Sequence, residues 1–343
     1  KLRSRSNSGS YANWIRERDY DPLRHRAGLV AAIGQLKEPP LVSVLMPVFN
    51  TPKDLLDSAI ASVEAQIYPH WELCIADDCS PAPHVRGVLE EWRRRDPRVR
   101  TVFRDRNGHI SEATNSALAL ASGQWIAMMD HDDLLREHAL AEVALEIASH
   151  PTAEIVYSDE DKIDANGRRY DPYFKPDFSR ELFRSQNYLN HLTVHRAENV
   201  RAVGGWRPGF EGSQDYDLNL RVIERIDPRA RRYRPKGRYH WRAAEGSTAV
   251  SGSEKTYAYD AGFKALNEHV RRAGLSAVVE AIKRPTVRVL TRPEFPADEC
   301  GLPAAGGSRT AWRARRRRGR KFSTSRSLVH ACRLDRKLGA AIS

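Results

Sequence analysis

The sequence predicts an α/β fold in which helices cover a mostly parallel sheet. Short apolar runs without polar alternation recur along residues 41–157, as in strands that are buried on both faces. Segments with apolar residues at helical spacing lie between these runs. Strands that alternate with helices at this interval are typical of parallel sheets covered by helices, so the two patterns together predict the fold class.

The predicted elements follow one another from residue 41 onward. Residues 41–46 predict a strand, and Thr51-Pro52-Lys53-Asp54 predicts a helix start, because a capping hydroxyl, a proline and an acid favour a first turn. Further strands are predicted at residues 71–76, 99–103, 125–129, 154–157 and 239–242. Further helices are predicted near residues 85–92, 111–121, 136–149 and 218–226.

These elements divide the chain into three parts. Residues 1–40 are polar and irregular in pattern, and we expect a lead-in that is the remnant of a longer N-terminal region. Residues 41–280 hold the predicted α/β domain. Residues 281–343 are rich in arginine, and we expect a disordered tail, either native or produced by a shift of reading frame.

The net charge of +12 does not indicate a nucleic-acid-binding protein. Of 56 Lys/Arg and 44 Asp/Glu residues, residues 301–343 contain 12 basic residues and one acid, which leaves 44 and 43 for residues 1–300. The basic excess therefore belongs to the tail, and no specific nucleic-acid partner is expected. The tail predicts peripheral contact with anionic lipids on the inner membrane face, with a merely solvated tail as the alternative.

The sequence predicts a cytoplasmic protein. No apolar run approaches the roughly 18–20 residues that span a membrane, and no segment near residue 1 resembles a signal peptide. Cys74, Cys79, Cys300 and Cys332 show neither CxxC spacing nor the density of a small secreted domain. We therefore expect unpaired thiols in a reducing compartment.

Polar residues gather at the ends of three predicted strands. These ends carry Pro47-Val48-Phe49-Asn50, Asp77-Asp78 and Asp130-His131-Asp132-Asp133. Sheets of this class bind ligands outside the carboxyl ends of their strands, so the three segments predict one crevice. A dinucleotide site is not expected there, because no GxGxxG follows the first strand.

The acidic segment predicts a metal site. Asp130, Asp132 and Asp133 supply carboxylates at a turn, and hard cations such as Mg²⁺ or Mn²⁺ prefer oxygen ligands. Such an ion would neutralise the charge of a departing diphosphate. The alternative is an acidic turn without a ligand; the position at the end of a buried strand, in the same crevice as Asp77-Asp78, favours the metal site.

Five further positions carry suitable chemistry, each with a structural alternative. Asp78 can accept hydrogen bonds from a base or ribose, or cap its own loop. His109 and Asn115, around a helix start, can face a nucleotide or serve as cap and surface groups. Asp215, at a loop-to-helix junction, can take a proton from a hydroxyl or act as a helix N-terminal acid. His240 can bind a metal, although a lone histidine is more often structural.

An ordered set of motifs resembles a known family. The stretches are VSVLMPVFN (42–50), WELCIADDCS (71–80), NGHISEATNSALALASGQWIAMMDHDDLL (107–135), YSDEDKID (157–164), NYLNHLTVHR (187–196), GSQDYDLNLR (212–221) and YHWRAAEGSTA (239–249). Over roughly residues 40–275 the chain is similar to the inverting family 2 glycosyltransferases of GT-A fold. Within them it resembles bacterial enzymes of O-antigen, rhamnan and related surface-polysaccharide assembly.

The resemblance implies how a donor and an acceptor are bound. The donor would be a nucleotide diphosphate sugar, of UDP or dTDP type, and the acceptor a glycan or lipid-linked glycan. The donor-binding residues would be Pro47, Val48, Asn50, Asp78, His109, Asn115 and Asp130. Trp241 and Arg242 would lie near the acceptor or the diphosphate.

The resemblance also implies a metal-dependent displacement with inversion. Asp132 would be the principal ligand of Mg²⁺ or Mn²⁺, with His240 as a further ligand and Asp133 at most supporting. Asp215 would be the catalytic base that deprotonates the acceptor. The family has a Glu-Asp pair there, and in this chain Gln214 replaces the Glu while the Asp is retained.

Two other functions are consistent with parts of the sequence. A sugar-1-phosphate nucleotidyltransferase also uses a parallel sheet with an acidic metal site, but it needs a Gly-rich basic loop after the first strand, where this chain has Pro47-Val48-Phe49-Asn50. A catalytically inactive sugar-nucleotide-binding module is the second alternative. The presence of both Asp132 and Asp215 argues against it.

Overall fold

The computed structural model describes residues 8–242, 256–283 and 286–291. Residues 243–249 of the YHWRAAEGSTA stretch lie outside the described residues, as does the basic tail from residue 292 onward. The expectations about lipid contact and disorder of that tail therefore stay predictions. None of the helices in the described part combines the length and apolar character that crossing a bilayer requires.

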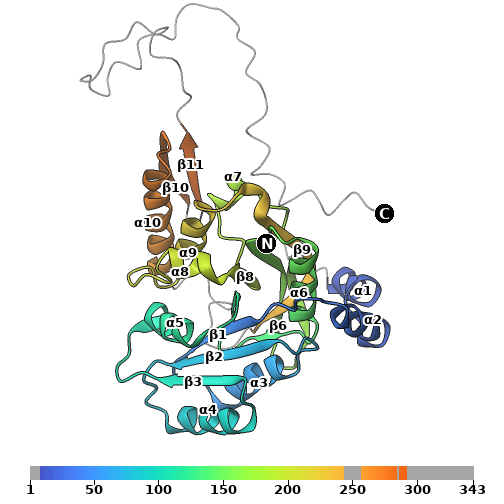
Figure 1. The fold of residues 1–343 in the computed structure, drawn as a ribbon. Helices are drawn as coiled ribbons and strands as arrows, with labels where there is room; N and C mark the ends of the chain where they lie inside the picture. The colour runs from blue at the N-terminus through green and yellow to red at the C-terminus, as the bar shows by residue number, and fades with distance from the viewer. Residues whose placement is uncertain (1–7, 243–255, 284–285, 292–343) are drawn as a thin grey trace, which may run out of the picture. The chain divides into compact units, whose positions relative to one another are not determined.

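A mixed sheet of nine strands forms the centre of the fold (Figure 1), in the order β3-β2-β1-β4-β8-β6-β9-β5, with β7 paired to β6. Its parallel half contains β1 (Val42–Val48), β2 (Trp71–Asp77), β3 (Val99–Phe103) and β4 (Trp125–Met128). The other half contains β5 (Leu134–Leu135), β6 (Ile155–Ile163), β7 (Arg169–Tyr173), β8 (Thr193–Arg196) and β9 (Arg231–Arg242). In that half, β8 is antiparallel to β4 and β6, whereas β6 and β9 are parallel.

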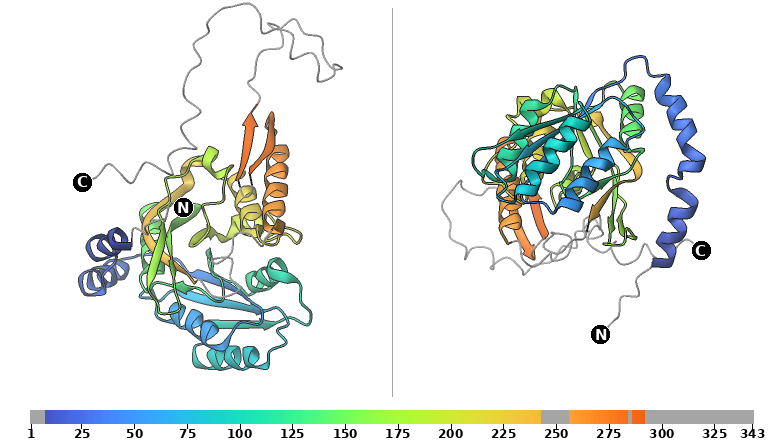
Figure 2. Two further views of the ribbon diagram at one scale, coloured as in Figure 1. Left: turned by 180° about the vertical axis from the view of Figure 1, so that it is seen from behind. Right: turned by 90° about the horizontal axis from the view of Figure 1, so that it is seen from below.

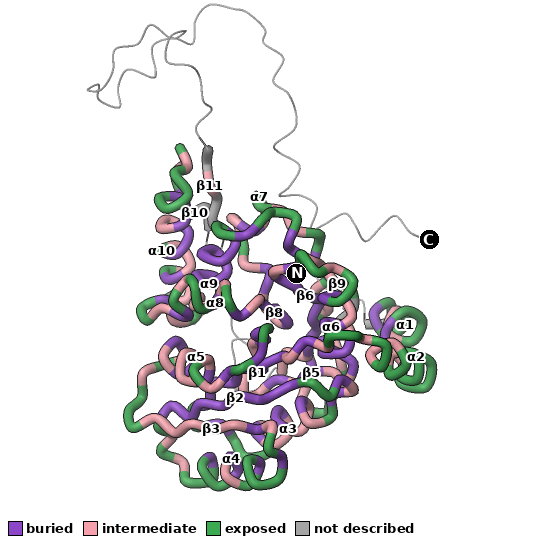
Figure 3. Tube along the Cα trace, viewed as in Figure 1, coloured by how far each residue is buried: buried purple, intermediate pink, exposed green. Residues whose placement is uncertain are grey.

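Helices pack on both faces of the sheet and enclose two apolar cores. One core contains side chains of α3 (Lys53–Glu64), α4 (Pro83–Arg95) and α6 (Ala139–Ser149). The other contains side chains of α5 (His109–Leu120), α7 (Arg180–Phe183), α8 (Ala197–Ala202), α9 (Gln214–Ile223) and α10 (Thr256–Arg272). Strand β1 shows the division, because Val44 and Met46 enter the first core while Leu45 enters the second. Figure 3 shows β1 and β2 buried along their length.

The predicted parallel strands are confirmed, and two strands are longer than predicted. The strand expected at residues 154–157 continues as β6 to Ile163, and the one expected at 239–242 is the end of β9. Apolar patterning stops at Tyr157 because the following residues are polar. Asp159, Glu160 and Asp161 are nevertheless buried, since hydrogen bonds and ion pairs from neighbouring side chains satisfy them.

The two ends of the described chain also differ from expectation. Residues 1–40 are not irregular throughout, because they contain α1 (Ser8–Arg18) and α2 (Pro22–Gly34). Asp21 caps α2 by accepting from the Leu23 N–H, but none of the helix residues is buried, so no apolar stripe marks it in the sequence. Beyond residue 280, β10 (Ala277–Lys283) and β11 (Thr286–Thr291) form an antiparallel pair.

Buried polar contacts attach the N-terminal helices to the sheet. Figures 1 and 2 show α1 and α2 beside the sheet, and α2 contacts α6. Asp19 follows α1, its side chain is fully buried, and its Oδ2 lies 2.5 Å from both Arg136 Nη1 and Arg169 Nη1. Tyr11 donates to Asp161 on β6, and the Tyr20 ring stacks on His138 at 3.9 Å. The lead-in is thus part of the folded domain.

Asp19→Ala is expected to lower the free energy of unfolding by about 3 kcal/mol, because it leaves two guanidinium groups, on side chains that are only 14% exposed, without this shared carboxylate. Urea unfolding followed by circular dichroism measures the change. The control is Glu90→Gln, which removes an exposed pair with Arg86 and should cost less than about 0.5 kcal/mol. Equal stability of the two variants would contradict the structural role of Asp19.

Candidate active site

The acidic loop 130–133 connects β4 in the middle of the sheet to β5 at its edge, and β9 holds it in place. The Tyr239 hydroxyl donates to Asp133 Oδ2 at 2.7 Å and accepts from the Asp130 N–H at 3.1 Å. The Arg242 N–H donates to Asp133 Oδ1 at 2.7 Å, and its Nε–H donates to the Asp132 carbonyl at 2.8 Å. These four bonds fix the turn that presents the carboxylates.

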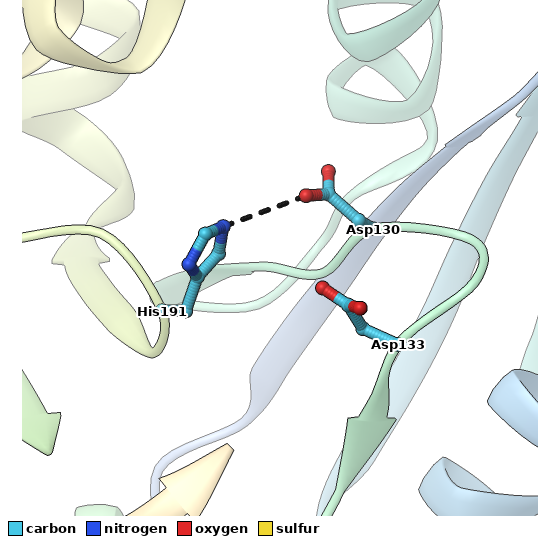
Figure 4. A group of neighbouring side chains, drawn as sticks. All are labelled: Asp130, Asp133 and His191. Carbon is cyan, nitrogen blue, oxygen red and sulfur yellow. Dashed lines mark ion pairs between the residues drawn. The ribbon is translucent and has the colours of Figure 1, made fainter. Parts of the chain in front are cut away.

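Asp130, Asp133 and His191 form a group that is able to hold a metal ion (Figure 4). One ligand atom from each residue lies within 4.8 Å of the others. His191 comes from the segment before β8, and its Nε2 is 3.5 Å from Asp130 Oδ2. Two carboxylates and an imidazole are a donor set that suits Mn²⁺ and related divalent ions.

Electrostatics in this group favour a cation. Burial raises the pKa of Asp133 well above its usual range, and the negative charges of Asp130 and Asp132 raise it further. Burial also raises the pKa of Asp132, which the charge of Asp130 reinforces. A divalent ion would reverse these effects, because it stabilises the ionised carboxylates. The residues present therefore fit the metal that the sequence predicts.

Glu160 faces the other side of the His191 ring. Its Oε2 lies 3.2 Å from Nδ1 of His191 and 3.2 Å from Nζ of Lys175. Although burial opposes ionisation of the imidazole, the charge of Glu160 raises the pKa of His191 well above its usual range. The Tyr239 ring stacks on His191 with centroids 4.9 Å apart, so the imidazole is held on three sides.

Asp132, His240 and Trp241 take different positions around the group. The Asp132 side chain is partly exposed and lies outside the group of three ligand atoms. His240 Nδ1 contacts Asp161, which Arg169 and Tyr11 also contact. Successive residues of a strand face opposite sides, so His240 lies on the other face of β9 from Tyr239. Trp241 is near His191, with ring centroids 5.6 Å apart.

Asp215 lines the same pocket as the metal-binding candidates. Asp130 and His191 line this pocket together with Gln214 and Asp215, which lie at the start of α9. Asp215 accepts from Asn187 Nδ2–H and from the Tyr216 N–H, both at 2.8 Å. Burial raises the pKa of Asp215, against the opposing charge of His191. A carboxylate in this setting is suited to accept a proton.

Most of the predicted nucleoside-binding residues gather at the carboxyl ends of β1 and β2. Pro47 and Val48 are buried in β1, and the Val48 carbonyl accepts from the Asp78 N–H at 2.8 Å. The Asp78 carboxylate pairs with Arg104 at 2.8 Å and accepts from the Gly108 N–H at 3.0 Å. The Asp78 side chain is thus tied to the loop that precedes α5.

Three further residues were predicted to bind the nucleotide. Asn50 is exposed with φ of 55°, its N–H donates to Ser80 Oγ, and its side chain accepts from the Ala82 N–H. His109 is exposed at the first position of α5. Asn115 exchanges two hydrogen bonds with the Trp206 backbone, at 2.7 and 2.9 Å, so its amide joins α5 to the segment before α9.

Several residues of the site carry no local signal in the sequence. His191 and Lys175 are single residues in segments without regular spacing, and Glu160 is one of several acids in YSDEDKID. In the sequence, Tyr239 is indistinguishable from an ordinary apolar residue of a predicted strand. Only the resemblance of whole stretches, which includes NYLNHLTVHR, draws attention to the region of His191.

Comparison with known proteins identifies the type of domain. Residues 43–201 match the model of the family described as Glycosyl transferase family 2. The chain is 38% identical over 269 residues to the O-antigen biosynthesis protein RfbC of Myxococcus xanthus, an alignment that covers 78% of this chain and 21% of that protein. The chain spans 26% and 21% of the length of the first curated relatives that it matches.

Solved structures show the same fold. TarS of S. aureus in complex with UDP-GlcNAc is similar with a TM-score of 0.54 and 18% identity, over 68% of each chain. The mannosyltransferase PcManGT from Pyrobaculum calidifontis, in complex with GDP-Man and Mn²⁺, is similar with a TM-score of 0.50 and 16% identity, over 74% of this chain and 71% of that one. The predicted GT-A fold is confirmed by these likenesses, with a mixed sheet.

Proposed function

The chain belongs to glycosyl transferase family 2, and we propose that it transfers a sugar from a nucleotide diphosphate to a glycan hydroxyl in surface-polysaccharide assembly. UDP- and dTDP-sugars are the proposed donors, and a glycan or lipid-linked glycan is the proposed acceptor. The relative RfbC is named for O-antigen biosynthesis, which supports this class of acceptor. The two structural neighbours contain UDP-GlcNAc and GDP-Man, which supports a nucleotide-sugar donor.

The observation that carries the proposal is a pocket that combines two residues of a metal-binding group with a half-buried carboxylate. Asp130 and His191 of that group line the pocket together with Asp215. A transferase needs both parts in one place, because the leaving diphosphate develops negative charge while the attacking hydroxyl loses a proton. The sequence-predicted positions near β1 and β2 lie at the neighbouring strand ends, where a nucleoside would bind.

The metal would be held by Asp130, Asp133 and His191, and we retain Asp132 from the same loop as a further proposed ligand. When bound, Mg²⁺ or Mn²⁺ would supply positive charge to the diphosphate. Tyr239 and Arg242 hold the loop that carries the acids. His240 contacts Asp161 on the opposite face of β9, and the pair supports the strand. Arg242 contacts the loop and Trp241 lies beside His191, and both are proposed to border the diphosphate or the acceptor.

Asp215 is the proposed base for a single displacement with inversion. Its carboxylate would take the proton of the acceptor hydroxyl, while the oxygen of that hydroxyl bonds to the anomeric carbon and the bond to the diphosphate breaks. Asn187 and the Tyr216 N–H donate to Asp215 and orient it. The reaction leaves no covalent intermediate with the protein, because the acceptor attacks from the face opposite the leaving group.

Metal-dependent nucleotide release is expected with one class of donor. The full chain is incubated with UDP-, dTDP- and GDP-sugars in the presence of Mn²⁺ or Mg²⁺, and released nucleotide is measured. EDTA is expected to abolish the release, because no ion then reaches the diphosphate. Asp132→Ala is expected to lower it, because the ion loses a further proposed ligand while Asp130, Asp133 and His191 remain. Glu90→Gln, an exposed change on α4, is the control and should release nucleotide at the wild-type rate. Release that persists in EDTA would refute metal dependence.

Asp215→Asn is expected to leave donor binding intact and to reduce sugar transfer by about 10²–10⁴-fold, because the amide does not accept the proton. Calorimetric titration with the donor found above measures binding, and product formation measures transfer. Because the amide is nearly isosteric with the carboxylate, the fold should be unchanged. Transfer at the wild-type rate would show that another group is the base.

The acidic limb of the pH profile should report Asp215. Burial raises the pKa of this carboxyl, and the base acts only when ionised, so kcat/KM falls as the pH falls through that pKa. Asn187 donates to the ionised form, so Asn187→Ala should move the limb to higher pH. Profiles of both proteins at saturating metal measure the shift. If the acidic limb of Asn187→Ala stays at the wild-type pH, the limb reports a group other than Asp215.

A further inference from the structure

We infer that Glu160, supported by Lys175, positions His191 as the nitrogen ligand of the metal, and this inference rests on the metal site proposed above. Oε2 of Glu160 is 3.2 Å from Nδ1 of His191. The other ring nitrogen, Nε2, is 3.5 Å from Asp130 Oδ2, on the side of the acidic loop. Glu160 itself lies outside the three residues that form the ligand group, so it acts through His191.

A neutral imidazole offers one nitrogen with a lone pair and one with a proton. When Nδ1–H donates to the Glu160 carboxylate, the lone pair is at Nε2 and faces the acidic loop. A carboxylate behind a histidine also makes its free nitrogen a stronger ligand, as in other carboxylate–histidine–metal arrangements. Of the two neutral forms of His191, Glu160 thereby selects the one whose lone pair faces the acidic loop.

Lys175 fixes both the carboxylate and the backbone that bears the histidine. Its Nζ is 3.2 Å from Glu160 Oε2, and it donates to the carbonyl of His191 at 2.7 Å and to that of Asn190. The Lys175 side chain is fully buried, so water does not compete for these contacts. Stacking on Tyr239 sets the plane of the imidazole, and Glu160 sets its rotation within that plane.

The pleat of β6 directs Glu160 toward the site. Glu160 pairs in register with Tyr239, and the next residue, Asp161, pairs with His240. Because adjacent residues face opposite sides, Glu160 contacts the histidine of the metal group while Asp161 contacts His240 on the far side. The strand thus carries two carboxylate–histidine pairs, of which one serves the site.

Binding of Mn²⁺ alone and Mg²⁺ alone to the full chain, measured by calorimetric titration, tests this role. Glu160→Leu/Lys175→Met removes both charges, so no unpaired charge stays buried, and should raise the Kd for Mn²⁺ by about 10–100-fold. The Kd for Mg²⁺ should rise less, because Mg²⁺ prefers oxygen ligands. Glu160→Gln keeps an acceptor for Nδ1–H and should give a smaller rise. If Glu160 and Lys175 had a purely structural role, the Kd values for Mn²⁺ and Mg²⁺ would rise by the same factor.

Glu72→Gln is the matched control, because Glu72 is a carboxylate of similar burial on β2, at 7% exposure against 8% for Glu160. It should change the Kd for Mn²⁺ by less than about twofold, since it touches no part of the metal group. Unchanged Mn²⁺ affinity in the double variant, with affinity lost in His191→Ala, would overturn the role of Glu160 while the metal site stands. Absence of Mn²⁺ binding in the wild-type chain would instead refute the metal site and this inference with it.

If the double variant does not fold, the role of Glu160 is tested by the protonation of the two ring nitrogens of His191 in the Mg²⁺-bound wild-type chain. The inference requires a proton on Nδ1 and none on Nε2, which ¹⁵N NMR of the histidine side chains reports, with His191→Gln to assign the signal. A proton on Nε2 in the Mg²⁺-bound chain would overturn it.

Discussion

The parallel pairing of β6 with β9 is the constraint on which the site depends. Its register places Glu160 beside Tyr239 and Asp161 beside His240. Tyr239 then holds the acidic loop through Asp133, while Glu160 holds His191 against the other side of that loop. A shift of one residue in either strand would turn these side chains to the opposite face, because side chains alternate along a strand. The register therefore determines which residues meet.

Charge is distributed unevenly around this pair of strands. Lys175 and Arg169 lie against Glu160 and Asp161, so the acids of β6 are paired with cations inside the protein. In the loop after β4, burial and the charge of Asp130 raise the pKa of Asp133. The acids of β6 are thus compensated by buried or half-buried cations, whereas burial and neighbouring negative charge oppose ionisation of the acids in the loop. A divalent ion would stabilise those loop carboxylates, and this links the stability of the loop to the chemistry proposed for it.

Local patterns predicted the parallel half of the sheet well, because each of its strands is an apolar run buried on both faces. They predicted the acids of residues 130–133 at a ligand-binding edge, because these acids follow a buried strand, whereas Asp215 was predicted from its loop-to-helix junction and from the family resemblance. They did not predict α2, which buries none of its residues, or the polar half of β6, whose burial depends on partners distant in the chain. Asp78 and Asn115 were predicted near a nucleotide, and the structure adds contacts to Arg104 and Trp206 that a single segment does not reveal.

The sequence by itself determined the fold class, and it predicted the edge of the sheet and the type of chemistry that are proposed for the site, because apolar runs and strand-end acids are local features. Only the tertiary structure decided which histidine joins the acids. His191 and His240 are equivalent as isolated residues, yet the first lies 3.5 Å from Asp130 and the second contacts Asp161 on the other face of β9. That choice depends on strand register and on buried partners far away in the chain. The acidic turn is a property of four adjacent residues, whereas the histidine beside it is a property of the folded sheet.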